Sequence, residues 1–440
     1  AIFPNSYSII QDNIIDNEPA DVLYYPDFAT GNLVGTSHAI YVTSGYSGVL
    51  IDGNTFNNCR GWAVQFNTSS FNAAYANTVS NNKFYRCFAV GYIGGGNQPQ
   101  QNINWINNIH EKCGYLSLDH ANAKVTLSGN KWSGVLDTIT GSANFSMEAI
   151  GINRVKEFRC SDEFYGKTHA SFGNSGCINI SDDAGVGDLV FSNCIADKSN
   201  KFFIAVGTSL NLIGSLTVKN SRIGTGNYLN YTNVALAASP RYNIVFEGND
   251  FTNNVEANQP VYANFGFIFS NNTVRTKSTA SAAIYLGGWV TNAKDMIIKG
   301  NTFINEGSEF GFRATDASVN NKVYFQDNKL VGNVEIRLDS NTFKHRSNTF
   351  STLTNTYTDN VAVVGTSGNY LVGTTTDNAT DKLQVNGTVK STQFKLSALN
   401  TAPASATATG TTGEIRITAD YVYVCVATNT WVRNALTTWS

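Results

Sequence analysis

A short polar phrase that recurs along most of the chain limits this sequence to very few folds. The phrase is a polar residue, an asparagine, one spacer and an apolar residue, as in Gly53-Asn54-Thr55-Phe56. Most intervals between successive asparagines run from 22 residues (108 to 130) to 29 residues (272 to 301). A period of this size predicts a solenoid of stacked coils. The asparagines are Asn13, Asn54, Asn82, Asn108, Asn130, Asn193, Asn249, Asn272, Asn301 and Asn328, and Asp162 and Asn220 stand near the expected places where the phrase is blurred.

Runs of β-branched and aromatic residues around each asparagine indicate which solenoid forms. Apolar residues five and three positions before the asparagine alternate with polar ones, as at Val49 and Ile51. Such alternation places one set of side chains on one face of a strand. A third run follows about ten residues after the asparagine, for example at Ala63–Phe66 and Tyr115–Leu118. Three short strands per repeat, without amphipathic helices, predict an all-β chain folded as a parallel β-helix.

The asparagine has a structural role in such a fold. Stacked coils place each asparagine over the one in the next coil, and a column of side-chain amides can form hydrogen bonds along the stack. Asparagine also tolerates the left-handed backbone of a tight turn. We therefore interpret these asparagines as turn and ladder residues and expect no binding site at them.

The composition argues against partners that are bound through charge. Charged residues make up 14% of the chain and the net charge is −2, so nothing favours binding to nucleic acid or to an anionic membrane. No apolar run approaches the roughly 20 residues that span a bilayer. Coil-like sequence begins close to Ala1, and we expect the chain to be a fragment of a longer protein.

Three of the seven cysteines stand five positions after the asparagine of their coil, namely Cys59, Cys87 and Cys113 (54 + 5, 82 + 5, 108 + 5). This spacing predicts a column of buried thiols that behave as small apolar side chains. Disulfides are the less favoured alternative, and stacked free thiols fit folding in a reducing cell. The sequence has no paired Cys or Cys/His at the short spacing of a metal site, and we expect neither a metal nor another cofactor.

The sequence divides the chain into three parts. Residues 1–350 carry the coils, with loops expected to extend from the stack around Asp27–Gly35, Thr140–Met147 and Gly166–Ser175, and residues 351–380 form a connector. Residues 381–440 form a small β domain. We expect a hairpin at Asp381–Lys390 around Asn386-Gly387 and a three-stranded meander of Glu414–Thr418, Tyr421–Ala427 and Trp431–Leu436. A sheet this small scarcely buries its own face, which favours packing against copies of itself.

The tail resembles a known module. The segments DKLQVNGTVKSTQFKLSAL and TGEIRITADYVYVCVATNTWVRNALTTW are similar to the C-terminal module of many bacteriophage tailspikes, and the coils resemble the β-helix of those proteins. The resemblance implies a right-handed parallel β-helix, a homotrimer, and cleavage of bacterial capsular or O-antigen polysaccharide. It also implies a place in the phage tail, with assembly in the host cytoplasm, action at the bacterial surface and attachment to the rest of the tail through an absent N-terminal part.

Candidate catalytic residues are acids on neighbouring coils, because glycoside hydrolysis needs two carboxyl groups at a set separation. In Tyr115–His120 the buried Leu116 and Leu118 turn Ser117 and Asp119 outward. The following coils offer further acids at corresponding places. The predicted catalytic set is Asp119, Asp137 and Glu148, with Asp182 in reserve.

Aromatic side chains beside these acids are candidates for sugar binding. Trp62 and Trp289 stand next to strand ends and are predicted sugar platforms, and His120 is a predicted hydrogen-bonding neighbour of the substrate. By parity, Trp105, Trp132 and Tyr92 are predicted to point into the core.

Two other functions remain open on the sequence. A lyase acting on a uronate-containing polymer needs a group that takes the α-proton and a cation that neutralises the carboxylate, and the candidates are His120, Arg154, Lys167 and His169. A spike that binds sugar without cutting it is the third possibility. Products that absorb in the ultraviolet distinguish the lyase from the hydrolase.

Overall fold

The computed structural model of the chain forms two compact units, Ala1–Gln384 and Val385–Ser440. It describes residues 2–16, 38–43, 46–59, 61–67, 75–87, 89–96, 99–133, 149–166, 176–180, 186–196, 202–206, 214–223, 228–231, 244–253, 261–263, 268–276, 284–286, 296–306, 312–314, 323–332, 336–338, 343–346, 349–350, 363–364, 369–372, 378 and 380–438.

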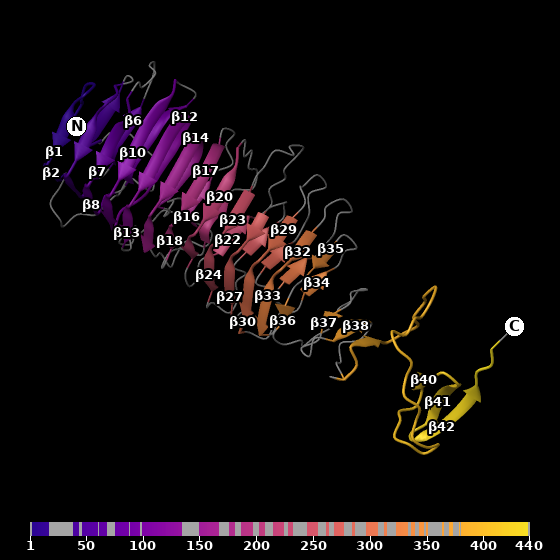
Figure 1. Ribbon diagram of the computed structural model, residues 1–440. Coiled ribbons are helices and arrows are strands. Elements are labelled where there is room, and N and C mark those ends of the chain that lie inside the picture. The colour runs from indigo at the N-terminus through magenta and orange to yellow at the C-terminus, as the bar shows by residue number, and fades with distance from the viewer. Residues whose placement is uncertain are drawn as a thin grey trace, which may run out of the picture. The chain divides into compact units, whose positions relative to one another are not determined.

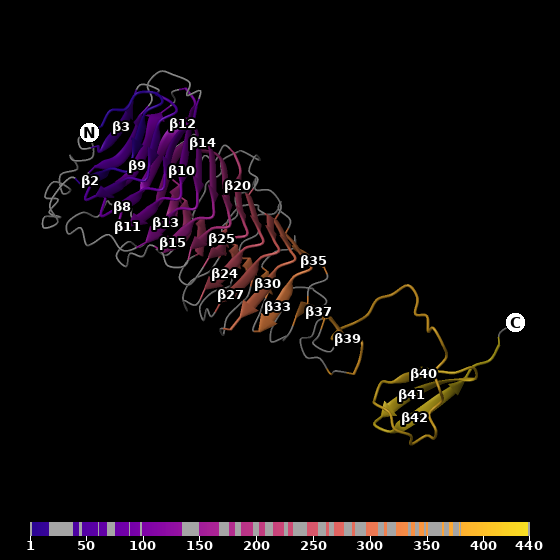
Figure 2. The same cartoon turned by 60° about the vertical axis from the view of Figure 1, so that its left-hand side comes forward.

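Each coil of the first unit contributes three strands, except the last, which contributes two among the described residues, and the corresponding strands of successive coils pair side by side in parallel (Figures 1 and 2). The strand before the asparagine recurs as β1 (Ile9–Gln11), β4 (Leu50–Asp52), β7 (Asn77–Ser80), β10 (Gln101–Ile106), β12 (Leu116–Ser128), β14 (Ile150–Ser161), β17 (Val186–Ser192), β20 (Leu216–Lys219), β23 (Ile244–Glu247), β26 (Ile268–Ser270), β29 (Met296–Lys299), β32 (Val323–Gln326) and β35 (Phe343–Arg346).

The strand after the asparagine forms a separate sheet of 13 strands. These are β2 (Ile14–Asp16), β5 (Thr55–Asn57), β8 (Lys83–Tyr85), β11 (Ile109–Glu111), β13 (Lys131–Ser133), β15 (Phe164–Gly166), β18 (Ile195–Ala196), β21 (Arg222–Ile223), β24 (Asp250–Asn253), β27 (Thr273–Thr276), β30 (Thr302–Asn305), β33 (Lys329–Gly332) and β36 (Thr349–Phe350).

The third strand of the coil recurs as β3 (Ile40–Thr43), β6 (Trp62–Asn67), β9 (Ala89–Gly96), the first parts of β12 and β14, β16 (Gly176–Ile180), β19 (Phe202–Val206), β22 (Tyr228–Tyr231), β25 (Val261–Ala263), β28 (Ile284–Leu286), β31 (Phe312–Ala314) and β34 (Ile336–Leu338). Because β12 and β14 run on into the next coil, the first and third ladders form one sheet of 23 strands. The described residues include no helix. The predicted parallel β-helix is confirmed.

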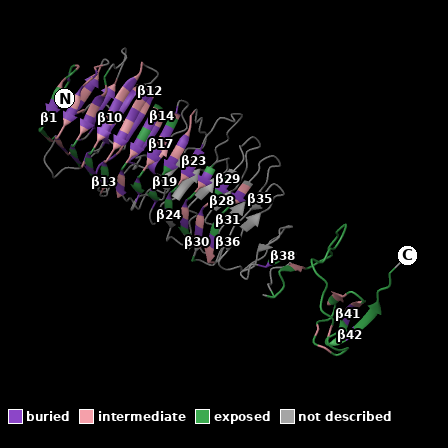
Figure 3. Ribbon diagram, viewed as in Figure 1, coloured by how far each residue is buried: buried purple, intermediate pink, exposed green. Residues whose placement is uncertain are grey.

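The inward positions are those that the alternation predicts. Val49, Ile51, Trp105 and Leu127 are at most 1% exposed, and Figure 3 shows buried residues recurring along these strands. Side chains at equal positions stack from coil to coil, as the parallel rings of Phe56 and Phe84 do at 4.7 Å between centroids. The predicted burial of Trp105 and Trp132 is confirmed.

The asparagines form the predicted ladder inside the turn. Oδ1 of Asn108 accepts hydrogen bonds from the backbone N–H (2.9 Å) and Nδ2 (3.0 Å) of Asn82. Nδ2 of Asn108 donates to the carbonyl of Val79 (2.9 Å) and to Oδ1 of Asn130 (3.0 Å). Every polar atom of this buried side chain is therefore satisfied. The same arrangement recurs at Asn54, Asn82, Asn272 and Asn301. Asn249 donates in the same way, but its Oδ1 accepts only from the backbone N–H of Ser221 (2.9 Å).

Three coils in the middle of the stack depart from the ladder, and here the predicted register is wrong by one residue. Glu163 takes the asparagine position and accepts from Asn130, and the next two coils carry Cys194 and Ser221, joined by a 3.1 Å bond from the Cys194 N–H to the Ser221 hydroxyl. The predicted Asp162, Asn193 and Asn220 instead occupy the turn position before the ladder, with φ of 57°, 54° and 48°. That position favours Asn, Asp or Gly because its backbone is left-handed.

Glu163 is a buried carboxyl group in this ladder. Its Oε1 accepts from the backbone N–H (3.0 Å) and Nδ2 (2.6 Å) of Asn130, and its Oε2 accepts from the indole N–H of Trp132 (3.0 Å). The side chain is 1% exposed. Burial raises the pKa of Glu163 to about 7, although these hydrogen bonds favour the ionised form.

We expect the stability of the β-helix to fall as the pH rises from about 4.5 to 7. The folded protein holds a proton on Glu163 more tightly than the unfolded chain does. The stabilisation from protonated Glu163 is therefore complete below the pKa of this group in the unfolded chain, and it is lost as the pH rises through its pKa in the folded protein. A pKa of about 7 against 4.5 corresponds to about 3 kcal/mol. The free energy of unfolding of Glu163→Gln, measured by denaturation between pH 4 and 8, should lack this decrease with rising pH. Glu157→Gln is the control, because the hydrogen bond from Arg159 lowers the pKa of Glu157 instead of raising it. Equal slopes in wild type and Glu163→Gln would contradict the assignment.

The cysteine column is confirmed. Cys59, Cys87 and Cys113 are buried, and the backbone N–H of Cys87 lies 3.4 Å from the sulfur of Cys113. All seven cysteines are unbridged and buried. Burial raises the pKa of the Cys87 thiol, so it stays protonated.

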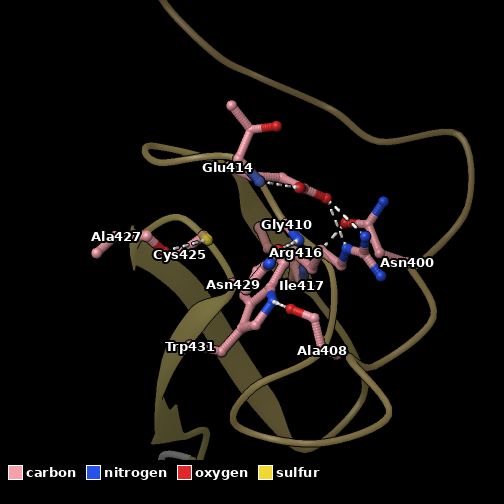
Figure 4. A network of polar contacts seen from close by, with 11 residues as sticks. Asn400, Ala408, Gly410, Glu414, Arg416, Ile417, Cys425, Ala427, Asn429 and Trp431 are labelled. Carbon is pink, nitrogen blue, oxygen red and sulfur yellow. Dashed lines mark hydrogen bonds and ion pairs between the residues drawn. The ribbon is translucent and has the colours of Figure 1, made fainter.

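The C-terminal unit contains the predicted meander, formed by β40 (Ile415–Ile417), β41 (Tyr421–Ala427) and β42 (Thr430–Ala435) in antiparallel pairing. The segment that precedes β40 contacts this sheet, because the indole N–H of Trp431 donates to the carbonyl of Ala408 (3.0 Å; Figure 4). Arg416 lies over the same ring and bonds to Glu414.

The predicted hairpin at Asp381–Lys390 is wrong. Only β39 (Leu383–Val385) is a strand there, and it belongs to a sheet with β37 (Val363–Val364) and β38 (Tyr370–Val372). Residues 388–390 form no strand, so Asn386-Gly387 ends a strand without reversing it into a partner. The predicted loops at 27–35 and 140–147, residues 167–175 of the third loop, and most of the connector lie outside the described residues.

Candidate functional site

The first coils align a row of polar and aromatic side chains on the outside of the third ladder. Val64 and Phe66 of β6 point inward, so Gln65 points outward. Strand register places Tyr41 of β3, Gln65 of β6, Tyr92 of β9 and Ser117 of β12 in line. We call these four residues the outer row.

Asp119 lies two positions further along β12 and has two partners from neighbouring coils. The hydroxyl of Tyr92 donates to its Oδ2 (3.2 Å) and Nε of Arg154 donates to its Oδ1 (2.5 Å). The side chains of Arg154 and Asp119 are 30% and 19% exposed. The predicted outward orientation of Asp119 is confirmed, and solvent reaches the cluster.

A bulge brings Arg154 to Asp119. Leu118 pairs with Ile152, but the next residue, Asp119, pairs with Arg154, so Asn153 is an additional residue in β14. A bulge redirects the side chains that follow it and often lies beside a functional site. In a strand without this bulge, Asn153 would pair with Asp119, and β14 would bring no cation to the carboxylate.

The electrostatics of the cluster give each group a distinct role. Burial first, and then the charge of Asp119, raises the pKa of Tyr92 to about 12, so its hydroxyl remains a hydrogen-bond donor at physiological pH. Asp119 accepts a short charge-assisted bond from a guanidinium, which is the interaction of an ionised carboxylate. An ionised carboxylate serves as a base or nucleophile and not as a proton donor.

The outward position of Tyr92 corrects its predicted place in the core. Gly91 and Ile93 are the inward residues of β9, in register with Leu116 and Leu118. A side chain at Gly91 would collide with Leu116 and Trp105. Because the glycine carries no apolar side chain, the alternation in β9 predicts the wrong face for Tyr92.

His120 and Trp62, which are predicted to bind the substrate, are both buried in the structure. His120 is fully buried, accepts at Nδ1 from the N–H of Asn122 (3.2 Å), and has a pKa lowered by burial. Trp62 is 7% exposed, and its ring packs against those of Tyr92 and Tyr115, with centroids 4.9 and 5.5 Å away. Trp62 therefore supports Tyr92 and offers little open ring face to a sugar.

Several predicted residues lie outside the described part of the chain, namely Asp137, Glu148, Asp182, Trp289, Lys167 and His169. Their roles stay predictions. Among the described residues, no group of three or more His, Cys, Asp or Glu side chains could hold a metal ion.

Gly94 makes room for Tyr92 to reach Asp119. A β-carbon at Gly94 would collide with the Tyr92 ring. Gly94→Ala should therefore displace the ring and break the bond to Asp119. If Asp119 is catalytic, the loss of one hydrogen bond to a charged group, about 1.5–3 kcal/mol, should slow the reaction at least tenfold.

The partner variant for this prediction is Tyr92→Phe, which removes only the hydroxyl. It should slow the reaction as much as Gly94→Ala does, and the double variant should be no slower than either. Additive losses would mean that Gly94 acts through something other than Tyr92.

No helix among the described residues is long and apolar enough to cross a membrane. Compared with protein-family models, with curated proteins and with solved structures, the chain matches none of them.

Proposed function

We propose that the chain binds and depolymerises a bacterial surface polysaccharide, either capsule or O-antigen, by hydrolysis of a glycosidic bond. The observation that carries this proposal is the ionised, partly exposed Asp119, held by Arg154 and Tyr92 beside the outer row. Polar and aromatic side chains around a carboxylate suit a sugar, which offers hydroxyl groups and apolar ring faces.

In this reaction Asp119 is the base or the nucleophile. As a base it removes a proton from water, whose oxygen then attacks the anomeric carbon; as a nucleophile it attacks that carbon itself, and water later releases the sugar. A second carboxyl group must protonate the leaving oxygen. Asp137, Glu148 and Asp182 are the candidates for that acid.

The lyase remains a second candidate because Arg154 and Tyr92 are adjacent. A lyase needs a cation to neutralise the uronate and a base to take the α-proton. A Tyr92 pKa of about 12 makes that side chain a poor base at neutral pH. The described geometry therefore favours hydrolysis. Binding without cutting is the third candidate.

The test is to incubate the protein with purified capsular and O-antigen polysaccharides and to analyse the products. New reducing ends without ultraviolet absorbance are expected. Absorbing unsaturated ends would establish the lyase, and binding without products would establish the non-catalytic spike. If no polysaccharide is bound or cut, the proposal is wrong.

We also propose that the chain is part of a phage tailspike and assembles as a homotrimer, acting at the bacterial surface as part of the virion. In support, the C-terminal unit buries few apolar side chains (Tyr423, Cys425 and Trp431) and leaves Ile415 and Val432 60% and 50% exposed. Ile415, Val424 and Val432 are in register across β40, β41 and β42. Light scattering should give three times the chain mass of 47.6 kDa, and a monomer would contradict the proposal.

A further inference from the structure

Gln65, in the middle of the outer row, carries a buried acceptor that nothing in the described structure uses. The residue is 7% exposed, and its Oε1 has no hydrogen-bond donor among the described residues. A buried carbonyl oxygen without a partner costs free energy, and an orphaned group in a folded protein calls for an explanation.

Packing of the core does not explain this amide. Its neighbours in the strand, Val64 and Phe66, fill the interior, whereas Gln65 is on the opposite face, between Tyr41 and Tyr92. Both tyrosines are half-buried. An apolar side chain of similar length at this position would avoid the unpaired oxygen.

We propose that Gln65 accepts a hydrogen bond from a hydroxyl group of the polysaccharide, so that Tyr41, Gln65 and Tyr92 form a subsite for one sugar ring. The inference rests on the proposed function. In the complex, the sugar hydroxyl donates to Oε1, and the tyrosine rings contact the apolar face of the sugar. A site of this kind rejects a sugar that lacks the hydroxyl, because the oxygen would again be unpaired.

The position relative to Asp119 gives the direction of the bound polymer. Gln65 is on β6 and Asp119 on β12, two strands apart in the ladder through β9, or about 10 Å at the usual strand spacing. The subsite therefore holds a ring close to, but distinct from, the one that Asp119 attacks. The polymer runs along the stack from Asp119 toward the N-terminal coils.

Access to the amide requires a side chain to move. Oε1 is enclosed in the free protein, and Tyr92 is held by its bond to Asp119 and by Trp62. Rotation of Tyr92 would break its bond to Asp119, so we expect Tyr41, on the other side of Gln65, to move instead. Trp62 packs against Tyr92 in the same row, so a sugar bound beside Tyr92 should change the fluorescence of the Trp62 indole, and Trp62→Phe should remove that change.

The experiment measures affinity and stability together in Gln65→Leu, made in the whole 440-residue chain that also carries Asp119→Asn to prevent cutting. The probes are purified capsular and O-antigen polysaccharides, and titration calorimetry uses one that the Asp119→Asn protein binds. We expect at least tenfold weaker binding and a melting temperature that is unchanged or higher, since the unpaired oxygen is gone. Gln326→Leu, at a half-buried position of β32, is the control and should change neither. Gln65→Met replaces Gln65→Leu if the latter does not fold.

Unchanged affinity in a stable Gln65 variant would overturn the subsite and leave the proposed function intact. A lower melting temperature without a change in affinity would also overturn it, because Gln65 would then be structural. If the Asp119→Asn protein and the wild type bind no polysaccharide in the set, the proposed function fails and the subsite fails with it.

Discussion

Replacement of Asp119 by asparagine should reduce polysaccharide cleavage by a factor of about 10²–10⁴, the usual contribution of a positioned base, while sugar binding and assembly persist. Asparagine has nearly the shape of aspartate and can still accept from Tyr92 and Arg154 through one oxygen. It lacks the negative charge that removes a proton or attacks the anomeric carbon. The rate of release of new reducing ends checks the prediction, together with affinity and light scattering on the same sample.

Glu157→Gln is the matched control for charge. Glu157 lies on β14, the strand next to that of Asp119, and it bonds to Arg159 (2.6 Å) and Lys124 (3.2 Å), so its replacement removes an outward carboxylate and its ion pairs without touching Asp119. It should leave the rate unchanged. Glu148→Gln, outside the described residues, is predicted to be as inactive as Asp119→Asn. Full activity in both Asp119→Asn and Glu148→Gln would discard the proposed catalytic set.

Replacement of Asn108 by alanine should cost about 3–4 kcal/mol of stability. The side chain joins three coils through Asn82, Val79 and Asn130. Its removal leaves the backbone N–H of Asn82 and the carbonyl of Val79 without these partners in the interior, and breaking a buried network is among the most destabilising changes. The free energy of unfolding from denaturant titration, followed by the β-sheet circular dichroism signal, measures the loss.

Asn104→Ala provides the comparison on the same strand. Asn104 is half-buried on β10, between the inward residues Ile103 and Trp105, and is not part of the ladder. Its replacement should cost no more than about 0.5 kcal/mol, as for most surface changes. Equal losses in the two variants would mean that the ladder contributes no special stability.

The sequence by itself determined the coil. Alternation around a repeated asparagine predicts which residues point inward, and the spacing of Cys59, Cys87 and Cys113 predicts their column. These patterns are local: residues close in the chain decide the face of a strand and the conformation of a turn. The meander was predictable for the same reason.

Only the tertiary structure decided which side chains of different coils come into contact. The pairing of Asp119 with Arg154 depends on the bulge that leaves Asn153 unpaired in β14, and the contact of Tyr92 with Asp119 depends on the missing side chain at Gly94. The burial of Trp62 and His120 depends on what covers them. The sequence pattern does not specify these features, because a shift of one residue in register between coils moves a side chain to the opposite face.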